Sequence, residues 1–192
     1  MNQATRTFDK DPEVVGARMK HVVQGEYAII DEPDVVLTTI LGSCVAACIR
    51  DPLAKVGGMN HFLLPGDKNG GSDTVKYGIN AMELLINDIL KKGGKRDRLE
   101  AKLFGGANVV QGLSDVGAQN AAFAERFLNE EGIRCIGQSL GGDRARRIRY
   151  WPLTGRATQQ FLAPSESSVF QAERRKVEQP PPPSSSGTVE LF

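Results

Sequence analysis

The sequence predicts an α+β fold, in which helices and strands do not alternate in a regular βα order. Apolar side chains recur at helical spacing in two segments, 75–90 and 115–131. Short runs of β-branched and apolar residues, which are typical of strands, precede, separate and follow these segments. Because the strands cluster instead of alternating with helices, a parallel βα sheet is not indicated.

Four strands are expected before the first helix, over 21–30, 35–40, 45–49 and 59–64. Gly42-Ser43 separates the second strand from the third, and Pro65 ends the fourth. Strands joined by short connections usually lie side by side. We therefore expect the last three of these strands to form a meander in one sheet.

The first helix is the clearest element of the sequence, because Gly93-Gly94 ends its apolar pattern and Asp73 or Thr74 could cap its start. A loop rich in Gly, Asn, Ser and Asp, 66–74, precedes it. The remaining elements are expected to be a strand over 99–104, the second helix, a strand over 133–140, and a hairpin of 146–150 with 158–162. Gly105-Gly106 and Gly141-Gly142 are interpreted as tight turns.

One domain is the default for a chain of 192 residues. We place it at 21–163, after a flexible N-terminal segment, 1–20. The segment 164–192 is polar and contains PPPPSSS, a composition that cannot bury enough apolar surface to fold alone. It is predicted to be a disordered tail.

Composition excludes several classes of protein. The net charge of +1 gives no electrostatic case for nucleic-acid partners, and no apolar run approaches the ~20 residues of a membrane span. The N-terminus lacks the apolar core of a signal peptide. Three cysteines, an odd number, favour a reducing compartment over a disulfide framework. We expect a cytoplasmic protein without membrane insertion.

Three side chains in the stretch 35–65 suggest a cysteine nucleophile. Cys44 follows the Gly42-Ser43 break, His61 lies in a later apolar run, and Thr38 precedes the cysteine by six residues. A thiol, an imidazole and a hydroxyl can act as nucleophile, base and orienting group. The backbone amides of Ser43 and Cys44 are candidate oxyanion donors.

The motifs around these residues resemble the CheD family of chemoreceptor glutamine deamidases. The resemblance runs in order through GEYAII, GSC with VAACIRDP, GGMNHFLLP, YGINAMELLINDIL, AKLFGGAN, GAQNA and GGDRARRI, and it covers roughly 25–163. It implies a layered sandwich of helices packed on β-sheets. It also implies a cysteine–histidine–threonine triad without a cofactor, at Cys44, His61 and Thr38. The six-residue offset selects Thr38 over Thr39.

The resemblance further implies what the protein acts on. The expected substrates are glutamine side chains on the cytoplasmic helices of chemotaxis receptors, which become glutamates, and a CheC-type phosphatase is an implied partner. The alternative is a non-catalytic adaptor that binds receptors or the phosphatase. The co-occurrence of thiol, imidazole and hydroxyl favours the enzyme, because binding alone needs no thiol.

Other reactive and charged residues are given plainer interpretations. Cys44, Cys48 and His61 could supply zinc ligands but lack the paired spacing of zinc sites, so no metal is expected. Cys48 and Cys135 are interpreted as core residues. Four arginines form a basic cluster that could be a solvated strand edge or a rim that attracts acidic receptor segments: Arg144, Arg146, Arg147 and Arg149.

Overall fold

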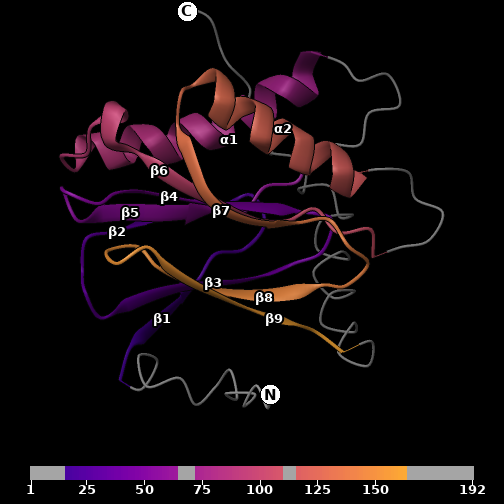
Figure 1. Ribbon diagram of the computed structural model, residues 1–192, viewed down its shortest axis with the longest axis horizontal. Coiled ribbons are helices and arrows are strands. Elements are labelled where there is room, and N and C mark those ends of the chain that lie inside the picture. Colours follow the sequence, from indigo (N-terminus) through magenta and orange to yellow (C-terminus); the bar gives the residue numbers. More distant parts are fainter. Residues whose placement is uncertain (1–15, 65–71, 110–115, 164–192) are drawn as a thin grey trace, which may run out of the picture.

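The computed structural model describes residues 16–64, 72–109 and 116–163. Two helices cover one face of a β-sheet, and a second sheet packs on the opposite face (Figure 1). The helices are α1 (Ser72–Lys91) and α2 (Val116–Glu130), with a 3-10 turn, η2 (Arg96–Arg98), between them. Neither of these α-helices is long and apolar enough to cross a bilayer. The predicted α+β class and layered sandwich are thus confirmed.

The nine described strands form two sheets. They are β1 (Arg18–His21), β2 (Tyr27–Ile30), β3 (Val35–Leu41), β4 (Val45–Asp51), β5 (Val56–Asn60), β6 (Glu100–Gly105), β7 (Arg134–Leu140), β8 (Arg146–Trp151) and β9 (Arg156–Phe161). The central sheet, which lies under the helices, has the order β2-β5-β4-β6-β7. The outer sheet has the order β1-β3-β8-β9. Only β1–β3 and β6–β7 pair in parallel among these strands.

The expected meander of three neighbouring strands is wrong. β4 and β5 do pair antiparallel, but β3 lies in the other sheet, between β1 and β8. The chain passes from one sheet to the other at Gly42-Ser43, so the bend there ends β3 and also connects the two sheets. As a result β3 faces β4 across the interior instead of pairing beside it.

The N-terminal boundary also differs from the expectation. The strand predicted over 21–30 is two strands in different sheets, and β1 begins at Arg18, within the segment expected to be flexible. The Arg18 guanidinium forms ion pairs with Glu32 and Asp34, and its backbone N–H donates to the Asp34 carbonyl at 2.8 Å. These contacts attach β1 to the start of β3. The predicted tail, 164–192, lies outside the described residues, as does most of the loop predicted over 66–74.

Two apolar clusters hold the three layers together. One lies between the helices and their sheet, and includes Leu85, Ile86, Leu103, Phe123 and Phe127. The other lies between the two sheets, and includes Leu37, Leu41, Met59, Ile148 and Tyr150. Alternate residues of β4 enter opposite clusters, since side chains along a strand alternate faces. β4 is therefore buried on both sides.

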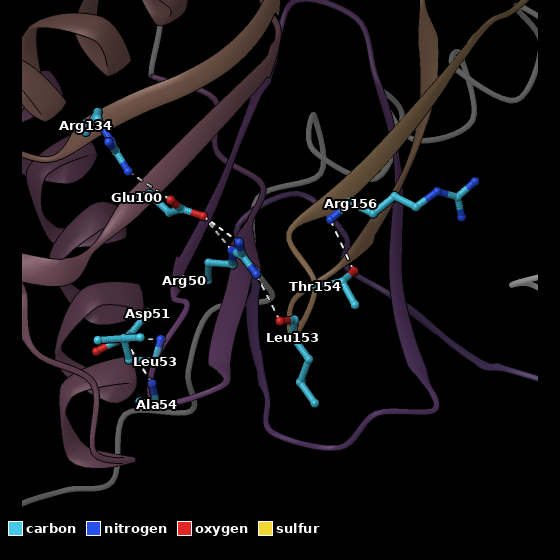
Figure 2. Close-up of polar contacts among 9 residues, drawn as sticks. All are labelled: Arg50, Asp51, Leu53, Ala54, Glu100, Arg134, Leu153, Thr154 and Arg156. Carbon is cyan, nitrogen blue, oxygen red and sulfur yellow. Dashed lines mark hydrogen bonds and ion pairs between the residues drawn. The ribbon is translucent and has the colours of Figure 1, made fainter.

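Arg50, near the end of β4, connects the two sheets (Figure 2). Its guanidinium contacts the Glu100 carboxylate at 2.7 Å, and Glu100 also pairs with Arg134 at 3.3 Å. A second Arg50 N–H donates at 2.9 Å to the carbonyl of Leu153, in the β8–β9 turn. The Arg50 side chain is mostly buried. This junction fixes the sheets together at the end of β4 that is remote from Cys44.

Asp51 organises the turn that follows β4. Its fully buried carboxylate accepts hydrogen bonds from the backbone N–H groups of Leu53, Ala54 and Lys95 and from the Arg98 guanidinium. Burial acts to raise the pKa of Asp51, but these donors outweigh it and bring the pKa to about 2. The carboxylate is therefore ionised at neutral pH and joins the turn to η2.

Candidate active site

The turn between β3 and β4 is held through its backbone carbonyls. Gly42 O accepts from Ala107 N–H at 2.7 Å, and Cys44 O accepts from Gly106 N–H at 2.8 Å. Between them, Ser43 O accepts from the side-chain amide of Asn120 at 2.8 Å. Three successive carbonyls are thus fixed by groups outside the turn. The peptide planes that carry the Ser43 and Cys44 N–H groups are fixed with them.

Glycine at position 105 permits this close approach. Gly105 has φ +110°, and a Cβ there would lie 2.1 Å from the carbonyl oxygen of Cys44. No L side chain fits that space, and a residue with a Cβ rarely adopts that φ. The loop after β6 can therefore lie directly against the cysteine turn. Gly105 ends β6, and both Gly105 and Gly106, where the sequence predicts a tight turn, have positive φ.

A backbone bridge brings His61 to the same place. Val45 and Phe62 exchange two N–H···O bonds, of 3.0 and 2.9 Å, just beyond the end of β5. Val45 and Phe62 both face the helices, so the residues before them, Cys44 and His61, face the outer sheet. In this register Cys44 and His61 are diagonal neighbours on one face. Such neighbours lie roughly 7–8 Å apart at the backbone, a separation that side chains can span.

Thr39 and Val22 define the tautomer of His61. The His61 Nδ1 atom lies 2.9 Å from Thr39 Oγ1 and 3.3 Å from the carbonyl oxygen of Val22. The Thr39 hydroxyl donates its one proton to that same carbonyl at 2.7 Å. It can therefore only accept from the ring, so Nδ1 carries the proton and Nε2 does not. Nε2 is buried and has no hydrogen-bond partner among the described residues.

Thr38, the predicted third member of the triad, does not contact His61 through its hydroxyl. Its Oγ1 donates instead to the Ile148 carbonyl of β8, at 2.8 Å. The reason is the change of sheet at Gly42-Ser43. β3 faces the site across the interior, and its inward face is the one that carries Leu37 and Leu41. Thr39 lies between them on that face, whereas Thr38 lies on the opposite face. The orienting hydroxyl expected from Thr38 is supplied by its neighbour.

Burial keeps His61 uncharged. The residue is 2% exposed, and removal from water lowers its pKa from the ordinary 6.5 to about 4, although the Val22 carbonyl acts in the opposite direction. No carboxylate contacts the ring in the described structure, so no opposite charge there offsets the cost of an imidazolium. At neutral pH the ring is a neutral base with its lone pair on Nε2.

Gln24 is a polar residue in contact with the thiol that sequence reasoning missed. The Cys44 Sγ–H donates to Gln24 Oε1 at 3.2 Å. Gln24 lies in the connection between β1 and β2, which wraps around His61: Gly25 N–H donates to His61 O at 2.7 Å, and His61 N–H donates to Glu26 O at 3.0 Å. A carboxamide therefore rests against the thiol. Only a prediction of two strands over 21–30 would have placed Gln24 near the cysteine.

Cys48 and Cys135 belong to no cluster of metal-ligating side chains in the described part of the chain. The described residues contain no group of three or more His, Cys, Asp or Glu side chains that could hold a metal ion. Cys48 is buried, as predicted, and burial raises its pKa. The prediction that Cys135 is a core residue is wrong: Cys135 is exposed, because β7 is the edge strand of its sheet.

The arginine cluster is not a solvated strand edge either. β8 lies inside its sheet, between β3 and β9, and Arg146 and Arg149 are buried. The Arg146 guanidinium donates to the backbone carbonyls of Ser139 and Gly141. Arg144 stacks on the Phe161 ring, 5.0 Å from its centre. The Arg146 hydrogen bonds join the outer sheet to the end of β7.

The depressed pKa of His61 makes stability depend on pH. Between pH 6.5 and 4 the unfolded chain binds a proton at this residue that the folded chain does not, so stability falls as pH falls through that window. The full effect is about 3 kcal/mol, of which about 2 kcal/mol is lost by pH 5. Urea unfolding of the wild type and of His61→Gln at pH 7 and pH 5 measures it. From pH 7 to pH 5, the free energy of unfolding of the wild type should fall by about 2 kcal/mol more than that of His61→Gln. An equal fall in the two proteins would contradict a buried neutral ring.

Comparison with known proteins shows the family of this chain. The family model "CheD chemotactic sensory transduction" matches residues 63–160. A protein of Rhizobium meliloti (strain 1021) named "Probable chemoreceptor glutamine deamidase CheD" is 58% identical over 158 residues, 81% of this chain and 86% of that one. Relatives with the same name from Caulobacter vibrioides (strain NA1000 / CB15N) and Agrobacterium fabrum are 55% and 56% identical, covering 95% and 85% of this chain and 96% and 92% of theirs. A solved Neisseria meningitidis structure, of family model DUF152, aligns with TM-score 0.45 and 12% identity over 67% of this chain and 65% of its own. This chain belongs to the CheD family.

Proposed function

We propose that this protein is a cytoplasmic chemoreceptor glutamine deamidase, which hydrolyses glutamine side-chain amides of receptors to glutamates with Cys44 as the nucleophile. The names of its relatives support the reaction. The observation that carries the mechanism is the buried His61 ring, whose Nδ1 is held by Thr39 and whose bare Nε2 shares the face of Cys44. A base fixed in one tautomer, on the face that carries the thiol, can take up the thiol proton during nucleophilic attack.

The reaction begins with attack of Cys44 Sγ on the amide carbon of the substrate glutamine. The thiol proton moves to His61 Nε2, the C=O bond opens to an oxyanion, and the imidazolium so formed returns its proton to the departing nitrogen. Ammonia leaves and a thioester remains on the cysteine. Water, deprotonated by the same Nε2, then attacks the thioester carbon. The cysteine recovers its proton, and the product is a glutamate side chain.

A neutral His61 decides how the thiol is activated. Because the pKa of His61 is about 4, the ring accepts the thiol proton during attack and does not hold a thiolate in advance. The imidazolium that forms transiently is costly in so dry a site, so it must be offset by the Thr39 and Val22 oxygens on Nδ1 and by the nearby oxyanion. The backbone N–H groups of Ser43 and Cys44 are the candidates to hold that oxyanion.

Gln24 marks where the substrate carboxamide goes. Its own carboxamide has the chemistry of the substrate and lies against Sγ at 3.2 Å. A receptor glutamine that reaches the thiol must therefore displace the Gln24 side chain. That side chain is half-buried in a connecting loop, which allows it to rotate away without disturbing either sheet.

The cytoplasmic helices of chemoreceptors are the proposed substrates, and a CheC-type phosphatase is a proposed partner. The relatives' names support the receptor. The phosphatase rests only on the family resemblance. The rival function is a non-catalytic adaptor for the same partners. It would need neither the thiol nor the oriented imidazole, so turnover distinguishes the two.

Replacement of the nucleophile tests the proposed reaction. Cys44→Ala should abolish conversion of glutamine to glutamate in a receptor helix peptide, measured by mass spectrometry, because the thioester can no longer form. Cys48→Ala is the matched control, since it removes a thiol from the same strand region without touching the turn, and it should stay active. Turnover by Cys44→Ala would refute the cysteine mechanism, and no turnover by the wild type on receptor peptides would favour the adaptor.

Removal of the side-chain hydroxyl is expected to have different effects at Thr38 and at Thr39. Thr39→Val should lower kcat by roughly 10- to 100-fold, since Nδ1 loses the oxygen that orients the ring and supports its charge. Thr38→Val removes a hydroxyl that bonds to β8, so it should lower stability while kcat stays within a few-fold of wild type. Steady-state deamidation and urea unfolding of both variants provide the measurement. A larger kcat loss for Thr38→Val would restore the triad expected from the sequence offset.

Removal of the Gln24 carboxamide should strengthen binding of the substrate. Gln24→Ala should lower KM for a receptor peptide without lowering kcat, because the peptide no longer competes with a side chain of the chain itself. Gln138→Ala, at a glutamine of β7 that bonds to Glu125, is the control and should leave both constants unchanged. A fall in kcat for Gln24→Ala would mean that the side chain takes part in the chemistry.

A further inference from the structure

Asn120 is a fully buried polar residue of α2 that reaches both halves of the site. Its Nδ2 donates to the Ser43 carbonyl at 2.8 Å, and its Oδ1 accepts from the Leu64 N–H at 2.8 Å. Ser43 immediately precedes the nucleophile, and Leu64 lies three residues beyond His61. One side-chain amide therefore joins the strand region of the thiol to the strand region of the base.

The bond to Ser43 O also determines where a catalytic amide points. The Ser43 carbonyl and the Cys44 N–H belong to one trans peptide plane, in which they point in opposite directions. When Asn120 draws that carbonyl toward α2, it turns the Cys44 N–H away from the helix layer. The Cys44 side chain faces away from the helix layer as well, toward the outer sheet.

We infer that Asn120 is a positioning residue for the oxyanion donor: it holds the Ser43–Cys44 peptide in the orientation that stabilises the tetrahedral intermediate. This rests on the proposed cysteine mechanism. Asn120 does not touch the substrate, since it lies in the helix layer and its two bonds are to backbone groups of the turn and of the strand segment after β5.

A carboxamide satisfies both contacts at any pH, whereas an ionised carboxylate satisfies only one of them. The site requires a donor toward Ser43 O and an acceptor toward Leu64 N–H, separated by the width of one amide. The substitution Asn120→Asp would keep the acceptor but would set a carboxylate oxygen against the Ser43 carbonyl. The peptide would then rotate to relieve that repulsion, and the Cys44 N–H would rotate with it.

The chain contains a matched control. Asn60 is equally buried, and it also joins a helix to the central sheet: its Oδ1 accepts from Ala47 N–H at 2.9 Å, and its Nδ2 donates to Ala81 O of α1 at 3.0 Å. It makes no bond to the Ser43–Cys44 peptide. Asn60→Asp therefore reproduces the structural cost of a buried Asn-to-Asp change without the proposed effect on the oxyanion donor.

Asn120→Asp and Asn60→Asp should be compared in full-length protein that carries Cys135→Ser, so that the exposed thiol does not react. Loss of a well-oriented oxyanion donor costs roughly 10²–10³ in kcat, so Asn120→Asp should lose that much with KM nearly unchanged. Asn60→Asp should lose comparable thermal stability but keep most of its kcat. Alkylation of Cys44 by iodoacetamide forms no oxyanion, so its rate should be alike in both variants. An equal loss of kcat in the two variants would overturn the inference.

A second probe is independent of turnover. Butyraldehyde labelled with ¹³C at its carbonyl carbon adds reversibly to a cysteine thiol, and the hemithioacetal oxygen occupies the place of the oxyanion. Its dissociation constant, measured by NMR, should rise in Asn120→Asp and stay near the wild-type value in Asn60→Asp. Wild-type protein that binds the aldehyde but does not deamidate receptor peptides would refute the proposed function and leave this inference standing. Equal aldehyde binding by the two variants would refute the inference alone.

Discussion

The passage of the chain from one sheet to the other at Gly42-Ser43 is the constraint on which the site depends. Because β3 and β4 lie in different sheets, the turn between them opens into the space between the layers. Cys44 enters that space from the central sheet, and Thr39 enters it from the outer sheet. His61 completes the group through the Val45–Phe62 bridge. A turn within one sheet would have left the thiol and the hydroxyl side by side, with no ring between the layers.

Most of the packing around this passage serves to keep it rigid. Gly105 allows the β6 loop to lie against the Cys44 carbonyl, and Gly117 allows the start of α2 to lie against that loop, since a Cβ there would be 2.5 Å from Ala107 O. At the other end of β4, Arg50 is held by Glu100 of the same sheet and donates to the Leu153 carbonyl of the outer sheet, which fixes the two sheets to each other. The site is thus formed by backbone groups whose positions are set by sheet packing. The interior of the site excludes water, and this burial lowers the pKa of His61, so the imidazole is neutral.

The sequence was sufficient for the types of nearly all elements, because strand composition, helical periodicity and glycine stops are local signals. It also predicted Cys44 and His61 as site residues, and the structure places them on one face of the same sheet. It failed where the outcome depended on which sheet a strand joins. The contact of His61 with Thr39, the exposure of Cys135 and the burial of Arg146 all follow from sheet order, which no local pattern encodes. Gln24 and Asn120 were missed because they reach the cysteine turn across 20 and 77 residues.

The weakest strand of the described structure carries the loop that covers the base. β1 has four residues, most of them exposed, and among the described strands it pairs only with β3, in parallel, at the edge of the outer sheet. Segments with few buried contacts open locally at a free-energy cost well below that of global unfolding. Release of β1 would withdraw the Val22 carbonyl from His61 and the Gln24 carboxamide from Cys44, and it would disturb the apolar cluster between the sheets only at Val22. Amide hydrogens of this strand are therefore expected to exchange with solvent long before those of β4, and the interior of the site shares that early access to water.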